Sequence, residues 1–194
     1  MAINRASTFI HWNFFIALEE DLDRLARYVD LSGQNDEAFS IEIARLFLSA
    51  SAEVDVVLKQ LAVKHNAAST AGSINAYFSE ITQHCPNFVG FTVLVPRFCL
   101  TLNPWSDWTA STPPIWWQDH NKVKHHRHNH FDRATVKNCL NAVAALFVSV
   151  IHLHAEEAAR GELLSLPRLF NVGDAHFGGT QMGRFGHSFV YKVS

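Results

Sequence analysis

Residues 119–130 concentrate the side chains of this sequence that are able to do chemistry. The segment reads DHNKVKHHRHNH and holds five of the chain's twelve histidines together with Lys122, Lys124 and Arg127. Unpaired His and Lys side chains are costly to bury, and an ordinary solvated helix face would also contain Glu and Gln. Lys and Arg supply fixed positive charge, whereas His donates hydrogen bonds and exchanges protons near neutral pH. This composition is typical of a surface that handles the phosphates of RNA.

If residues 116–130 are helical, side chains three and four positions apart share a face. One stripe then contains Trp117, Asn121, Lys124, His125 and His128, and the adjacent stripe contains Trp116, His120, Val123 and Arg127. The tryptophans would anchor the segment while its later turns project nitrogen donors. The alternative is a solvated helix face on which histidines happen to crowd.

Four further segments have apolar residues at helical spacing and would form the frame around this cluster. They are residues 8–31, 37–65 and 73–84, and a last helix that begins at Asp132 or Thr135 and runs to Ala159. Gly161 would end that last helix. Ser111 or Thr112 is expected to cap the helix that carries the cluster, because proline is tolerated in the first helical turn that follows.

The remaining patterns predict a small amount of β-structure. Runs of β-branched and aromatic residues at 88–95 and 98–102 indicate two short strands or one bent segment, and residues 185–193 indicate another strand. We therefore expect a mainly α fold: a bundle of about five helices with a small β accessory, made of a hairpin near residues 88–102 and a C-terminal strand.

One domain is the expectation for 194 residues. Within it, residues 85–113 would be a β/loop insertion and residues 162–194 a Gly-rich C-terminal extension. A net charge of -2 and 48% apolar residues exclude a disordered chain and a strongly basic nucleic-acid coat protein.

Cysteine usage and hydropathy indicate the compartment. Cys85, Cys99 and Cys139 are odd in number and widely spaced, which favours a reduced, cytoplasmic protein. The most apolar run, residues 143–153, is only about half the length of a membrane span, so no membrane association is expected. This run would be a core helix or a subunit interface.

Charged residues on the second predicted helix also need partners, because that helix is apolar almost all round. Glu53 or Asp55 would be a carboxylate that orients a histidine of the cluster. The alternative is that these carboxylates form structural salt bridges to Arg45, Lys59 or Arg24.

Two segments together resemble the HEPN superfamily. They are EIARLFLSASAEVDVVLKQL at 42–61 and WWQDHNKVKHHR at 116–127, followed by another apolar helix. More narrowly, the second segment is similar to bacterial HEPN-like proteins with Trp-Trp, a short spacer and Asn-Lys-Val-Lys-His-His-Arg. The resemblance covers about residues 38–158. It implies a small helical bundle, often dimeric, of the kind found in toxin, anti-phage and RNA-processing systems, many of which are metal-independent ribonucleases.

The superfamily signature is an Arg followed after four to six residues by a His, commonly with a polar residue directly after the Arg. Here Asn121 takes the polar position and His125 the His position, but His120 stands where the Arg is usual. A histidine is only partly charged at pH 7 and cannot form a bidentate fork with phosphate. Arg127 is the candidate for supplying the missing charge.

The resemblance implies an endoribonuclease that needs no cofactor and no metal. His125 would be the general base or acid, Lys124, Arg127 and His120 would hold the phosphate, and Asn121 would orient it. Lys122, His126 and His128 would add to phosphate binding. The implied partners are RNA or a nucleotide, a second copy of the chain, whose motif would face this one, and an antitoxin or other protein.

Two other functions stay open. A catalytically degenerate HEPN-like module would bind nucleic acid or protein without cleavage, and Trp105, Trp108, Trp116 and Trp117 would then stack on bases or anchor a partner, unless they seal the loop onto the bundle. A metal site would use His126 and His130 with His152, His154 or Glu156. Cys85 and Cys139 are expected to be buried small side chains and not nucleophiles.

Overall fold

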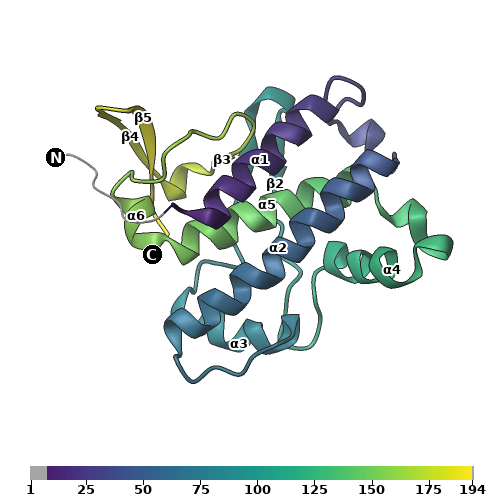
Figure 1. Ribbon diagram of the computed structural model, residues 1–194, viewed down its shortest axis with the longest axis horizontal. Helices are drawn as coiled ribbons and strands as arrows, with labels where there is room; N and C mark the ends of the chain where they lie inside the picture. Colours follow the sequence, from purple (N-terminus) through teal and green to yellow (C-terminus); the bar gives the residue numbers. More distant parts are fainter. Residues whose placement is uncertain (1–7, 194) are drawn as a thin grey trace.

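A computed structural model describes residues 8–193, which form six α-helices and two small antiparallel sheets (Figure 1). The helices are α1 (Ile10–Leu25), α2 (Ile41–His65), α3 (Ile74–His84), α4 (Ile115–His130), α5 (Val136–Leu153) and α6 (Ala155–Ala159). The strands are β1 (Val93–Val95), β2 (Leu100–Leu102), β3 (Asn171–Val172), β4 (Phe177–Gly183) and β5 (Gly186–Tyr191). The mainly α architecture with a small antiparallel sheet agrees with the sequence-based expectation.

Helix α5 is the centre of the fold. It lies beneath α1 and α2 in Figure 1, and all but two of its residues are buried. The rings of Phe15 on α1 and Phe147 on α5 stack at 4.8 Å. Among the described helices, α5 alone is long and apolar enough to cross a membrane, but it is buried inside the fold, and core helices meet the same length and composition criteria. Residues 143–153 therefore have no free face for a subunit interface, and their interpretation as a core helix is the correct one.

The first three helices follow the apolar periodicity. The buried residues of α1 include Trp12, Phe15, Leu18, Leu22 and Leu25, which recur every three or four positions. Ser40 and Ser73 cap α2 and α3 by accepting backbone N–H bonds from Ile43 and Ala76.

Ion pairs on the polar faces join α1 to its neighbours. The Arg45 guanidinium of α2 binds Glu42 on its own helix and Asp21 of α1, at 2.9 and 3.0 Å. Arg97, between β1 and β2, binds Asp23 of α1. Arg45 is thus engaged by Glu42 and Asp21, whereas the salt-bridge interpretation paired it with Glu53 or Asp55.

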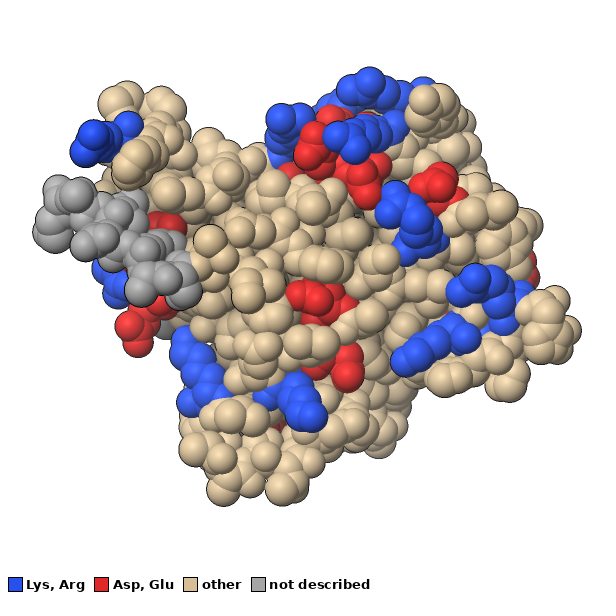
Figure 2. All heavy atoms as spheres, in the orientation of Figure 1, with Lys and Arg blue, Asp and Glu red and all other residues tan. Residues whose placement is uncertain are grey.

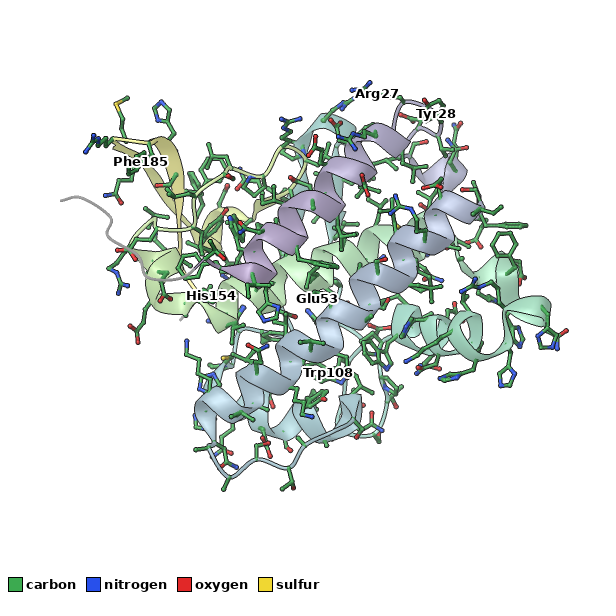
Figure 3. The ribbon with its side chains drawn as sticks, viewed as in Figure 1. Arg27, Tyr28, Glu53, Trp108, His154 and Phe185 are labelled. Carbon is green, nitrogen blue, oxygen red and sulfur yellow. The ribbon has the colours of Figure 1, made fainter. Side chains whose placement is uncertain are left out.

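The C-terminal part of the chain completes the sheet. β1 pairs with β2 as the expected hairpin, and β3 adds to the other side of β1, with Val93 opposite Val172. The expected C-terminal strand is β5, which pairs with an additional strand, β4. Phe185 lies exposed at the tip of this second hairpin (Figure 3).

Helix α1 holds this C-terminal part in place. The indole N–H of Trp12 donates to the Leu164 carbonyl at 2.6 Å. The buried carboxylate of Glu19 accepts the backbone N–H groups of Arg168, Leu169 and Phe170 at 2.8 to 2.9 Å. Burial raises the pKa of Glu19, while these three hydrogen bonds lower it.

Candidate functional site

The helix that carries the histidine cluster is fixed at its start by the preceding loop. The first backbone N–H of the helix, that of Ile115, donates to the Asp107 carboxylate at 2.9 Å. The residues expected to cap this helix, Ser111 and Thr112, therefore do not cap it. The Trp116 indole donates to the Pro104 carbonyl at 2.7 Å. Asp107 lies eight positions before Ile115. Capping patterns consider only the residues next to the helix start, so they do not predict this contact.

The four tryptophans of this region are buried, so they do not stand on the outer surface as platforms for bases or for a partner. They are Trp105, Trp108, Trp116 and Trp117. Neighbouring rings contact one another, for example Trp105 and Trp108 at 4.8 Å and Trp105 and Trp116 at 5.4 Å. Their interpretation as a seal between loop and bundle is therefore the correct one.

Helix α4 changes character along its length. Its first half is buried at Trp116, Trp117, Asp119, His120 and Val123. Its second half is exposed, and the backbone leaves helical geometry at His126, with φ -137° and ψ 40°. The single stripe expected to join His120 to Arg127 is therefore interrupted, because residues beyond the kink are rotated away from those before it.

The exposed part of α4 is basic. Its exposed Lys, Arg and His side chains are Lys122, Lys124, His125, His126, Arg127 and His128, which we call the basic surface. No Asp or Glu occurs between residues 120 and 131. In Figure 2 the blue side chains over α4 gather at the right of the molecule. A surface of this kind attracts polyanions.

His120 lies in a different environment from the rest of the cluster. Its side chain packs between the rings of Phe47 and Trp117, at 6.0 and 5.2 Å, and the residue is only 3% exposed. Burial, helped by the positive charges of Lys124 and His125, lowers the pKa of His120 to about 4. Its ring is therefore neutral at pH 7. Its buried Nδ1 has no hydrogen-bond partner among residues 8–193.

A polar network next to His120 ties α4 to α5. The Asp119 carboxylate accepts hydrogen bonds from Lys122 Nζ at 2.9 Å and from Asn138 Nδ2 at 3.0 Å. Asn138 Nδ2 also donates to the Arg133 carbonyl at 2.9 Å. Sequence reasoning missed these roles, although Asp119 is the only acid of the histidine-rich segment.

A pocket of about 370 Å³ lies between α2, the start of α3 and α4. Its polar lining comes from Ser51, Asp55, Ser73, His120, Asn121 and Lys124. The Tyr77 hydroxyl donates to the Asp55 carboxylate, and burial together with this carboxylate raises the pKa of Tyr77 to about 12. The fold thus brings Asp55 together with three residues of the cluster.

Glu53, the other carboxylate expected to orient a histidine of the cluster, instead binds a histidine of α1. It binds Nδ1 of His11 on α1 at 2.5 Å, and Gln60 binds the other ring nitrogen at 2.7 Å. In Figure 3 Glu53 lies on the part of α2 that borders α1. Asp55 and Glu53 lie on different faces of the helix because they are two positions apart.

The alternative metal site is not assembled. Within residues 8–193, no three His, Cys, Asp or Glu side chains are grouped so that they could hold a metal ion. His126 and His130 lie next to the start of α5, whereas His152 lies near its end, about 25 Å along the helix. His152 is buried between Phe88 and Phe91. Cys139 is also buried, which raises its thiol pKa to about 12 and leaves it a poor nucleophile.

No protein-family model, no curated protein and no solved structure matches this chain. Its function must therefore be inferred from the residues of the site.

Proposed function

We propose that this chain is a HEPN-like RNA-binding protein that cleaves RNA without a metal ion, in the cytoplasm, as part of a toxin or anti-phage system. The observation that carries the proposal is the basic surface of α4, where six exposed Lys, Arg and His side chains gather and, within residues 8–193, only Lys122 is paired with an acid, Asp119. Lys and Arg bind the backbone of RNA, and imidazoles next to a bound phosphate are able to transfer protons.

The chemistry needs only the residues of this surface. His125 takes the proton of a ribose 2′-hydroxyl, and the 2′-oxygen attacks the adjacent phosphorus. The bond from phosphorus to the 5′-oxygen breaks, and a second imidazole gives that oxygen a proton. The products are a 2′,3′-cyclic phosphate and a 5′-hydroxyl. Lys124 and Arg127 stabilise the charge on the phosphate oxygens.

His120 has a positioning role in this proposal. A neutral, buried ring does not replace the usual Arg as a cation on the phosphate. It packs between Phe47 and Trp117 and so supports the segment that carries Asn121 and His125. The fixed charge then has to come from Lys124 and Arg127.

We further propose a homodimer in which two basic surfaces face one another. Since α5 is buried, the support comes from apolar residues beside the end of α4. Phe39 and Ile41 are 49% and 77% exposed, and the Phe39 ring contacts Phe131 directly after α4, at 5.4 Å. Exposed apolar side chains next to a charged site are typical of a protein interface, for a second copy or an antitoxin.

One observation favours a second candidate, a HEPN-like module that binds RNA or a protein without cleaving RNA. It is the neutral His120 at the position where catalytic members of the superfamily carry an Arg. The two candidates share the basic surface and differ only in whether His125 transfers a proton.

The deciding experiment is RNA cleavage in EDTA by the purified protein and by His125→Ala. His187→Ala is the matched control, because His187 is an exposed histidine on β5, away from α4. Cleavage that survives EDTA and is lost only in His125→Ala would support the nuclease. Salt-dependent RNA binding without cleavage, with the dimer verified by light scattering, would favour the binding module. Cleavage equal in all three proteins would overturn the assignment of His125.

A further inference from the structure

The pocket between α2, α3 and α4 adjoins the basic surface, and Lys124 belongs to both. A volume of about 370 Å³ suits a single flat ring system such as one nucleobase. Trp117 and Ile74 supply its apolar lining. A strand of RNA held on the basic surface would thus have one cavity within reach.

The polar groups of this pocket differ in whether they donate or accept hydrogen bonds. The Asp55 carboxylate only accepts hydrogen bonds, whereas the Asn121 amide both donates and accepts. The Tyr77 hydroxyl donates to Asp55 and holds the carboxylate in place from the side of α3. A ligand that fits must therefore bring hydrogen-bond donors to Asp55.

Guanine is the nucleobase whose Watson–Crick edge offers two adjacent donors, the N1–H and the 2-amino group. In adenine and cytosine the amino group stands beside a ring acceptor, and in uracil one N–H lies between two carbonyls. Two parallel N–H bonds to one carboxylate give both energy and geometric selectivity. The guanine carbonyl at position 6 remains free for the Asn121 amide.

We propose that this pocket binds the guanine base of a nucleotide, with Asp55 on the N1–H and 2-amino groups, Asn121 on the 6-carbonyl and Lys124 on the phosphate. The base is either that of a free guanine nucleotide or that of a guanosine within RNA. The RNA case rests on the proposed function and would make the pocket the specificity site of the basic surface.

The test is calorimetric titration of the whole chain with GMP, IMP, AMP, CMP and UMP. IMP is the sharpest comparison, because it lacks only the 2-amino group. GMP is expected to bind at least about tenfold more tightly than each of the others, since a hydrogen bond to a charged group is lost in every other case.

Asp55→Asn tests the carboxylate, because an amide presents its own donor to the 2-amino group. The variant should bind GMP and IMP equally. Tyr77 retains an acceptor in this variant, and a thermal melt verifies its fold. Glu53→Gln on the same helix is the control and should keep the preference for GMP. Similar affinity for all five nucleotides, no binding of GMP, or a preference that survives Asp55→Asn would each overturn the pocket assignment.

Single-stranded RNAs with one guanosine or one inosine separate the two sources of the base and also the two proposals. Tighter binding of the guanosine RNA than of the inosine RNA would show that the pocket binds a guanosine within RNA. GMP binding without RNA binding would show that the ligand is a free nucleotide, and it would reject the proposed function but not the guanine pocket. Salt-dependent RNA binding that ignores guanosine, together with no GMP preference, leaves the proposed function standing and rejects the guanine pocket.

Discussion

The Asn138 amide donates to the Asp119 carboxylate at 3.0 Å, and this buried contact joins the histidine-bearing helix to the central helix. Asp119 lies on α4 and Asn138 in the first turn of α5, with the kinked end of α4 between them in the chain. The bond holds the basic surface in place from beneath.

Replacing Asp119 by Ala should therefore lower the free energy of unfolding by about 1–3 kcal/mol, because it removes the acceptor for Asn138 and Lys122. Urea unfolding measures the change. Asp132→Ala is the control, since Asp132 is exposed just beyond α4 and should shift stability by less than about 0.5 kcal/mol. Equal effects of the two substitutions would contradict the role assigned to the Asp119–Asn138 contact.

Acid should destabilise the fold through two histidines. Burial lowers the pKa of both His120 and His152 from 6.5 to about 4. Between pH 6.5 and about 4 the unfolded chain binds more protons than the folded chain, so the free energy of unfolding falls as the pH falls through this window. Each histidine contributes at most on the order of 3 kcal/mol.

Urea midpoints across this pH range measure the effect. His120→Gln and His152→Gln should each flatten the profile, whatever their stability at pH 7, whereas the exposed-site control His187→Gln should leave its slope unchanged. A profile as steep in both core variants as in the parent would show that other groups govern the acid sensitivity.

Glu19→Ala should loosen the C-terminal part of the chain. Three backbone N–H groups lose their acceptor, which we expect to cost about 3–5 kcal/mol of stability. Hydrogen exchange should accelerate at Arg168, Leu169 and Phe170. Glu20→Ala, which removes only an exposed partner of Arg24, should change neither measurement. Unchanged exchange in Glu19→Ala would reject this anchor.

RNA binding should weaken with salt in proportion to the cations on the basic surface. Lys124→Ala and Arg127→Ala should each reduce the slope of log affinity against log salt concentration by about 0.7 for single-stranded RNA. Fluorescence anisotropy of a labelled oligonucleotide at several salt concentrations gives the slope. Lys192→Ala, at an exposed position after β5, is the control. A slope that changes only in the control would place the RNA elsewhere.

The sequence predicted the helices well where local signals decide. The third helix was expected from residue 73, and Ser73 is its cap. Of the two starts expected for the last helix, Thr135 is the one that caps α5. Asp107 was missed because its bond to Ile115 depends on how a loop folds back. The last helix was expected to continue to Ala159, but it breaks at His154, where φ is -108° and ψ is 38°.

Strand β4 was missed because it is rich in glycine, which normally weakens a strand. A Cβ at Gly178 would stand 2.7 Å from a side-chain carbon of Val190, so close packing of the two strands requires glycine there. Such a requirement is visible only once the partner strand is in place.

For the site, helical spacing correctly grouped Trp117, Asn121 and Lys124, which share the pocket. Spacing did not indicate which histidine of the cluster is buried in the core, and the structure shows that it is His120. The kink at His126 was also not predicted, since no proline or glycine marks it.

The late position of β3 and β5 in the chain has a consequence for how the protein is made. Tyr191 packs against Trp12 and Phe147, and Val172 pairs with Val93, so residues from both ends of the sequence enclose the central helix. Contacts so distant in sequence form slowly. During synthesis α5 leaves the ribosome before β3 and β5 are translated, so part of its apolar surface stays uncovered until these strands emerge.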